Sequence, residues 1–150
     1  MIPVLEREAV IDAALHGAMT DLGCIAGAMV VATGEGRILR MRHNSGPLDA
    51  PMWSFATLSD GSLGPYEDTV ESGRPVFIES FMHLLARYPV FRGTARMDCL
   101  GAWMFLPLGI GGSAVGALAF GYRSPRLFSP ADQLAAETIA RRCGNSLMQG

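Results

Sequence analysis

The sequence predicts an α+β domain, built on an antiparallel sheet with helices packed against it. The first observation is the order of the predicted elements, which runs helix, strand, strand, short helix, strand, short helix, strand, strand, helix and does not alternate strand with helix. The second is a pair of apolar segments, 101–108 and 113–122, joined by the glycine-rich turn 109–112. The third is the capped helix predicted at 129–147, which follows them directly.

The composition suits a single folded unit. The chain has 150 residues, of which 49% are hydrophobic and 17% are charged. This length is enough to bury one core without cross-links, and no segment is of low complexity. We therefore expect one domain over residues 1–150.

Charge and targeting features restrict the partners and the compartment. The net charge of −2 provides no basic surface for nucleic acid or anionic lipid. Acidic Glu6 and Glu8 stand where a signal peptide would be basic, and no run of about 18 apolar residues could cross a membrane. The three cysteines are widely spaced, as is typical of reduced thiols. We expect a cytoplasmic protein that binds neither nucleic acid nor membrane.

The first part of the chain predicts a helix and a β-hairpin. Apolar residues recur at the spacing of one helical face in segment 5–22, at Ile11, Leu15, Ala18 and Leu22. Gly23 ends this helix. Segment 24–33 is a run of small and apolar residues typical of a buried strand, and the turn 33–36 connects it to a second strand at 37–43.

The middle of the chain predicts two short helices around one short strand. Segment 44–64 is rich in glycine and proline and should be mostly loop, with a helical turn near 53–58. Pro65 then begins a helix that ends before Gly73, at 65–72.

Segment 74–78 predicts a short strand. Its Pro75 indicates either that the proline stands at the beginning of the strand or that the strand lies at a sheet edge. Ser80 caps a helix at 81–88, and a connector follows at 90–100. The closing helix has Ser129 as its cap and Asp132 at its third position, a variant of the capping box.

Four blocks of sequence, taken in order, resemble a GAF domain of the kind found in bacterial signalling proteins with histidine kinase, phosphatase or diguanylate cyclase partners. They are residues 73–80, the pair 88–89, residues 101–108, and residues 115–118 followed by 128–129 and the last helix. The resemblance implies a central antiparallel sheet with the N- and C-terminal helices on one face. It also implies a small-molecule pocket on the other face, roofed by short helices and loops, and a sensory role without catalysis.

Alternation along the last strand divides its side chains between two faces. Ala117, Ala119 and Gly121 share one face and are small enough for a helix to approach, whereas Leu118, Phe120 and Tyr122 share the other. The last helix offers a stripe of mostly small residues for the same packing, formed by Ala131, Leu134, Ala135, Thr138 and Ile139. We expect the terminal helices to pack on the small-residue face and to form a homodimer.

Aromatic residues gather in the middle segments and in the strand that would face them. An aromatic pocket with a few polar groups is typical of a small-molecule site. The predicted ligand-binding residues are Trp53, Phe77, Phe81, His83, Arg96, Trp103 and Phe105. The alternative is that the aromatic side chains fill an ordinary core.

The sequence predicts no metal site, cofactor or catalytic group. His16, His43 and His83 do not form a pair at ligand spacing. Free methionine sulfoxide reductases resemble GAF domains and use several cysteines in the middle region, where this chain has only Cys99 beside acidic Asp98. All twelve basic residues are arginine, so the lysine of the cyclic-nucleotide-binding GAF signature is missing. None of the cysteines has the adjacent histidine common in bilin-binding members.

These features predict a sensory domain whose ligand is an unidentified small molecule. The terminal helices would form the homodimer and would carry the signal to an output domain or to a kinase or phosphatase partner. One alternative is a structural dimerisation module whose pocket is filled by its own side chains. A second is a thiol-based free methionine sulfoxide reductase.

Overall fold

The computed structural model describes residues 4–33, 38–45, 64–91, 100–110 and 113–149. The helices are α1 (Val4–Leu22), α2 (Pro65–Ser72), α3 (Phe81–Arg87), the 3-10 turn η2 (Pro89–Phe91) and α4 (Pro130–Gln149). The strands are β1 (Ala26–Thr33), β2 (Ile38–Ser45), β3 (Val76–Ile78), β4 (Ala102–Ile110) and β5 (Ser113–Tyr122). They form a sheet in the order β2-β1-β5-β4-β3 in which all neighbours are antiparallel. The predicted α+β class is confirmed.

The short helix α2 begins and ends where the sequence predicts. The backbone N–H of Gly64 donates to the Glu67 carboxylate at 3.1 Å, and Pro65 occupies the first helical position, where no intrahelical N–H bond is lost. Gly73 follows the last turn with φ of +69°, a conformation that glycine adopts without strain. Its N–H donates to the carbonyl of Thr69 at 3.0 Å.

Two serine caps position the starts of α3 and α4. The Ser80 hydroxyl accepts a hydrogen bond from the backbone N–H of His83 at 3.0 Å. The Ser129 hydroxyl accepts from the N–H of Asp132 at 3.1 Å, and the Asp132 carboxylate accepts from the N–H of Ser129 at 3.0 Å. The predicted capping box is therefore confirmed.

The strands differ from the prediction mainly at their ends. β4 continues to Ile110, so it includes two residues that the sequence assigned to the turn. β3 begins at Val76 because Pro75 has no N–H to donate to a neighbouring strand. The helical turn predicted near 53–58 lies outside the described residues, as does most of the predicted connector.

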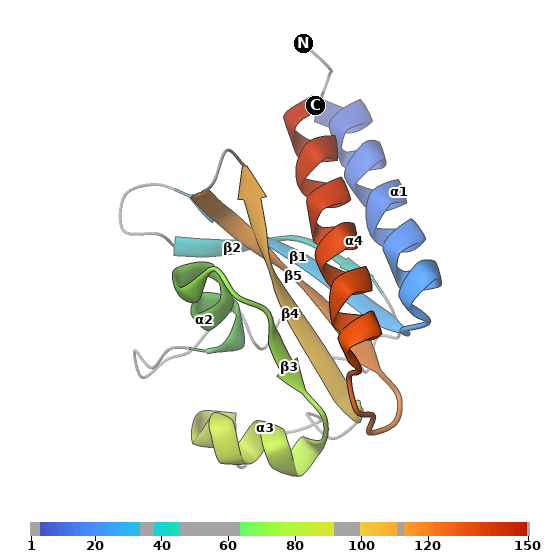
Figure 1. Cartoon of the computed structure of the whole chain (residues 1–150). Helices are drawn as coiled ribbons and strands as arrows, with labels where there is room; N and C mark the ends of the chain where they lie inside the picture. Colours follow the sequence, from blue (N-terminus) through green and yellow to red (C-terminus); the bar gives the residue numbers. More distant parts are fainter. Residues whose placement is uncertain (1–3, 34–37, 46–63, 92–99, 111–112, 150) are drawn as a thin grey trace.

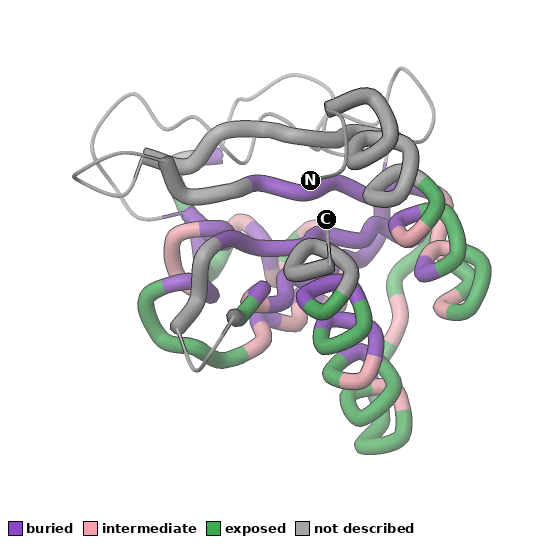
Figure 2. Tube along the Cα trace, turned by 90° about the horizontal axis from the view of Figure 1, so that it is seen from above, coloured by how far each residue is buried: buried purple, intermediate pink, exposed green. Residues whose placement is uncertain are grey.

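Helices cover both faces of the sheet, and each face has its own core. α1 and α4 lie side by side on one face, whereas α2 and α3 lie on the other (Figure 1). The cluster under α2 and α3 is called the pocket-side cluster, after the pocket that the sequence predicts on this face. It includes Tyr66, Leu84, Trp103, Phe105, Ala117 and Ala119. The helix-side cluster, under α1 and α4, includes Leu15, Leu106, Leu118, Phe120, Ile139 and Cys143. Figure 2 shows buried residues along the sheet and on one side of α4, with exposed residues on its outer side.

The assignment of small residues to the terminal helices was wrong. Ala117 and Ala119 lie in the pocket-side cluster, and the larger Leu118 and Phe120 face α1 and α4. Phe105 pairs with Ala119 across β4 and β5, so the small side chain leaves room for the aromatic ring.

The packing face of α4 is also rotated from the prediction. Among residues 130–145 of this helix, the buried ones are Ala136, Ile139, Ala140, Cys143 and Gly144, while Ala131, Leu134 and Ala135 are exposed. A Cβ on Gly144 would lie 2.8 Å from the carbonyl oxygen of Gly109, so the helix approaches β4 closely at this point. The small residues that permit close packing are on α4, and the large ones are on the sheet.

Candidate functional site

The sheet face under α2 and α3 carries the aromatic side chains of β4. Trp103 is 1% exposed and Phe105 is fully buried. The Phe105 ring packs edge-on against Tyr66 of α2, with ring centroids 5.3 Å apart. Phe81, the first residue of α3, is half-buried and packs against the same cluster. The structure therefore brings Phe81, Trp103 and Phe105 together.

Polar groups on this face connect α2 to its neighbours. The hydroxyl of Thr69, which is fully buried, lies 2.6 Å from the carbonyl oxygen of Arg74 and 3.2 Å from that of Phe105. The Tyr88 hydroxyl donates to the Asp68 carboxylate. Burial, together with this hydrogen bond, raises the pKa of Tyr88 above its ordinary value. The side-chain hydroxyls of Thr69 and Tyr88 on this face are therefore already engaged in hydrogen bonds within the chain.

Two other predicted ligand-binding residues, His83 and Phe77, are not brought into this cluster. His83 lies half-buried on α3, and its Nδ1 accepts a hydrogen bond from the backbone N–H of Glu79 at 3.1 Å. Phe77 packs with the helix-side cluster, with its ring centroid 5.2 Å from that of Phe128. Trp53 and Arg96 lie outside the described residues.

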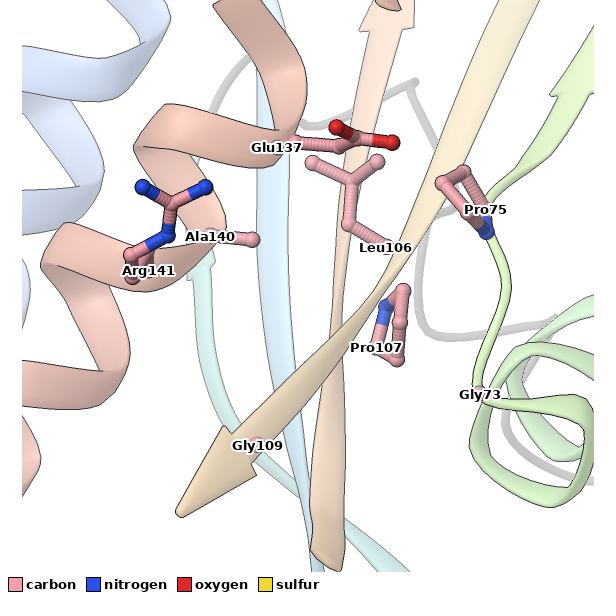
Figure 3. A pocket seen from close by; sticks show the side chains of 8 residues that line it. All are labelled: Gly73, Pro75, Leu106, Pro107, Gly109, Glu137, Ala140 and Arg141. Atoms are coloured by element: carbon pink, nitrogen blue, oxygen red, sulfur yellow. The ribbon is translucent and has the colours of Figure 1, made fainter. Parts of the chain in front are cut away.

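Among the described residues, the clefts on the helix side include three that have residues of α4 in their lining. The first, of about 320 Å³, lies between α4 and β4 and is lined by Gly73, Pro75, Leu106, Pro107, Gly109, Glu137, Ala140 and Arg141 (Figure 3). A second, of about 240 Å³, lies between α1 and α4 and includes Gly17 and Cys143. The third, an outer groove of about 400 Å³, is lined by Asp21, Ala131, Leu134, Ala135, Thr138, Ile139 and Arg142. None of these three is lined by Trp103 or Phe105.

The two described cysteines lie on the helix side and are held as neutral thiols. Burial raises the pKa of Cys24 to about 12, and its Sγ lies 3.8 Å from the carbonyl oxygen of Met19. Cys143 is buried in the helix-side cluster, and burial raises its pKa as well. A thiol that stays protonated is a poor nucleophile. Cys99 lies outside the described residues.

The described part of the chain contains neither a metal-binding cluster nor a membrane-spanning helix. Across residues 4–33, 38–45, 64–91, 100–110 and 113–149, no three histidine, cysteine, aspartate or glutamate side chains gather as a metal site would require. In the same ranges, no helix combines the length and apolar character needed to cross a bilayer.

Glu137 and Arg141 of α4 were not among the residues expected from the sequence, and Leu134 was expected on the packing face of this helix. Glu137 and Arg141 project from one side of this helix at the cleft of Figure 3, and Leu134 is 63% exposed in the outer groove. Their spacing along α4 gave a usable signal, because Leu134, Glu137 and Arg141 recur at three and four residues. The sequence could not tell which stripe of α4 faces the sheet.

The antiparallel sheet, with the paired terminal helices on one face and the short helices on the other, defines an α+β sheet-and-helix domain. The profile of the family described as the GAF domain matches residues 4–148. The chain therefore belongs to the GAF domain family. No curated protein matches the sequence significantly.

Solved structures share this fold at low sequence identity. The GAF domain region of a Geobacter sulfurreducens PCA protein has a TM-score of 0.78 at 16% identity, covering 97% of this chain and 95% of that one. A domain from a Sinorhizobium meliloti 1021 protein described as a two-component sensor histidine kinase has a TM-score of 0.65 at 19% identity, covering 99% and 93%. The free methionine-R-sulfoxide reductase of Neisseria meningitidis has a TM-score of 0.67 at 15% identity, covering 93% and 78%.

Proposed function

We propose that this GAF domain is a sensory and regulatory domain of bacterial signal transduction that binds a small molecule and has no catalytic activity. The observation that carries the proposal is the division of the sheet into two cores, with an aromatic cluster under α2 and α3 and the terminal helices on the opposite face. β4 and β5 contribute alternate residues to both cores. A ligand that shifts these strands on the aromatic face would therefore shift the side chains that pack against α4.

The ligand that this face would accept is a small apolar or aromatic molecule. Trp103, Phe105 and Phe81 offer rings and apolar edges. Thr69 and Tyr88 already have hydrogen-bond partners within the chain, so they would contribute little to a polar ligand.

The output of the domain would pass through α1 and α4. α1 begins and α4 ends at the same end of the molecule (Figure 1), so a neighbouring output domain, kinase or phosphatase could contact both helices. The fold shared with a domain of a sensor histidine kinase protein supports this arrangement.

The same two helices would form a homodimer around the outer groove. Leu134 projects from α4 with most of its surface exposed, between small residues and the ion pair of Arg142 with Asp21 at 3.6 Å. Two copies related by a two-fold axis would each place Leu134 against the groove of the other. This would remove an exposed leucine from water on both copies.

A ligand screen tests small-molecule binding. The screen itself uses the wild-type chain, because Trp53 is one of the predicted ligand-binding residues, and Trp53→Phe serves only to assign the emission of Trp103, the other tryptophan. We expect native mass spectrometry or a thermal-shift screen of small aromatic and apolar metabolites to find a ligand that raises the Tm and changes Trp103 emission. Phe105→Leu should weaken its binding, whereas Leu134→Ala on the opposite side should not. Absence of any such ligand would contradict the sensory proposal.

The burial of Trp103 and Phe105 by neighbouring side chains favours a second candidate, a structural dimerisation module. In that case the protein would be a dimer in solution, no compound would change Trp103 emission, and Phe105→Leu would alter only stability. The two candidates therefore differ in the ligand screen and agree on oligomeric state.

A thiol-dependent reductase is the remaining alternative, because the structures of similar fold include free methionine-R-sulfoxide reductases. An assay of free methionine sulfoxide reduction with a thiol reductant addresses it. We expect no activity in the wild type, since half-buried Cys24 and buried Cys143 are neutral thiols on the helix side. Activity that is lost in Cys99→Ser would show that the domain is an enzyme.

A further inference from the structure

Glu79 joins the β3–α3 junction to the start of α4. Its backbone N–H donates to Nδ1 of His83 at 3.1 Å, and its backbone carbonyl accepts from the N–H of Arg126 at 3.1 Å. Its carboxylate Oε2 accepts from the backbone N–H of Phe128 at 3.2 Å. One half-buried residue thus uses three polar groups to connect two segments that are distant in the sequence.

The segment held by Glu79 leads directly into the cap of α4. The Phe128 ring packs against Phe77 and Tyr122, with centroid distances of 5.2 and 5.8 Å. The Arg126 guanidinium lies 4.4 Å from the Tyr122 ring centroid and forms an ion pair with Asp132 at 3.3 Å. Asp132 is also the residue that completes the capping box of α4. A displacement of Phe128 would therefore reach the first turn of this helix.

The two segments belong to different faces of the sheet. α3 packs on the pocket-side cluster through Leu84 and Leu85, whereas Phe128 belongs to the helix-side cluster. β3, which leads into Glu79, is the last strand at this edge of the sheet among the described residues. The Glu79 contacts therefore pass around the sheet edge from one core to the other.

We propose that Glu79 is a positioning residue that couples α3 to the N-terminal turn of α4. The proposal rests on the sensory function above, for which it names a route from the aromatic face to the terminal helices. A movement of α3 displaces the Glu79 carboxylate, weakens its bond to the Phe128 N–H and loosens the cap formed by Ser129 and Asp132. The carboxylate also carries its negative charge close to the positive end of the α4 dipole, which favours this arrangement.

Amide hydrogen exchange measured by NMR on the whole chain tests the coupling. The reporters are the backbone amides of Phe128 and Asp132, which are bonded to Glu79 and to Ser129. Glu79→Ala should speed exchange at Phe128 on the order of tenfold, because the lost bond has a charged acceptor. Glu79→Gln keeps an acceptor oxygen and should restore part of the protection. Glu67→Gln alters a similar carboxylate-to-backbone bond in α2 and should leave both reporters unchanged.

A double-mutant comparison separates coupling from simple support. Leu85→Ala trims a half-buried side chain of α3 and should speed exchange at Phe128 and Asp132 when Glu79 is present. In the Glu79→Ala background, the same truncation should have no further effect on these amides. Equal effects of Leu85→Ala in both backgrounds, or uniformly faster exchange across the protein, would overturn the proposed route. Ligand binding detected by Trp103 emission would then still stand, because that measurement does not depend on Glu79.

Discussion

Gly101 shows how one missing side chain determines a local arrangement. Its N–H donates to the carbonyl of Tyr122 at 2.8 Å, and a Cβ here would lie 2.4 Å from the backbone carbonyl carbon of Ser124. Because the obstructing atoms are backbone, they cannot rotate away. We expect Gly101→Ala to lower the free energy of unfolding by about 1–3 kcal/mol, measured by urea denaturation.

Gly17→Ala is the matched control for this prediction. A Cβ at Gly17 meets nothing within 4 Å, and the residue lies inside α1. Alanine there should raise the free energy of unfolding by about 0.5–1 kcal/mol through its better helix propensity. If both variants changed stability by the same amount, the close approach at Gly101 would not be the cause.

The raised pKa of Tyr122 allows us to predict how the free energy of unfolding changes at alkaline pH. Its hydroxyl donates to the carbonyl of Leu22 at 3.2 Å, and burial raises its pKa to about 12. In the unfolded chain a tyrosine ionises near pH 10, so between about pH 10 and 12 the unfolded state releases this proton and the folded state keeps it. The contribution of Tyr122 to stability is complete below about pH 10 and is lost as the pH rises toward 12.

Tyr122→Phe should therefore make the fall in unfolding free energy above about pH 10 shallower than in the wild type. At neutral pH the variant should be less stable by about 1 kcal/mol, because the bond to Leu22 is lost. Denaturation series at several pH values measure both effects. An unchanged alkaline slope would argue against a buried phenol at this position.

Local chemistry made several residues predictable from the sequence. Pro65, Gly73, Ser80 and Ser129 act within one helical turn of their own positions, so propensity and capping rules suffice to place them. Glu79 is different, because its partner Phe128 is 49 residues away in the chain. Such a contact depends on how elements meet, which one sequence does not specify.

At the scale of elements, the cap of α4 gives a direct test. Ser129→Ala removes the hydroxyl that accepts from the N–H of Asp132 and should cost about 1 kcal/mol of unfolding free energy. Asn145→Ala, at an exposed position of the same helix, should be neutral or slightly stabilising. Chemical denaturation of the two variants compares them. A Ser129→Ala protein as stable as Asn145→Ala would mean that the box contributes little to α4.

The order and boundaries of most described elements could be predicted from periodicity. The side of each element that packs against its neighbours could not. Alternation correctly separated Ala117 and Ala119 from Leu118 and Phe120. It does not show which set meets which helices. The orientation depends on how side-chain volumes match between the layers. Here Phe105 pairs with the small Ala119, and the small residues of α4 pack against large residues of the strands.

At the scale of the whole molecule, the outer groove predicts the oligomeric state. Leu134→Glu places a charge where we propose that two copies meet, and it should convert a dimer into a monomer in sedimentation velocity. The fold should be retained, because Leu134 is 63% exposed. Met82→Glu is the matched control, since Met82 is 73% exposed but lies on α3, on the other face of the sheet. A wild type that sediments as a monomer at tens of micromolar would contradict the dimer.

The family and the α+β architecture were predictable because four sequence blocks and the element order extend over most of the chain. The site was predictable only in part. Phe81, Trp103 and Phe105 meet in one cluster, whereas Phe77 lies in the other, because β3 is too short for its alternation to reveal a face. Trp53 and Arg96 stay predictions.

The short pairing of β3 with β4 also affects how these molecules meet one another. β3 covers β4 only from Trp103 to Phe105, and the next stretch of β4 contains Pro107, which has no N–H. An incoming strand could not form a continuous ladder on this stretch, so the sheet edge resists end-to-end growth into fibres. Proline at this position therefore disfavours association of two molecules by strand pairing along this stretch of β4.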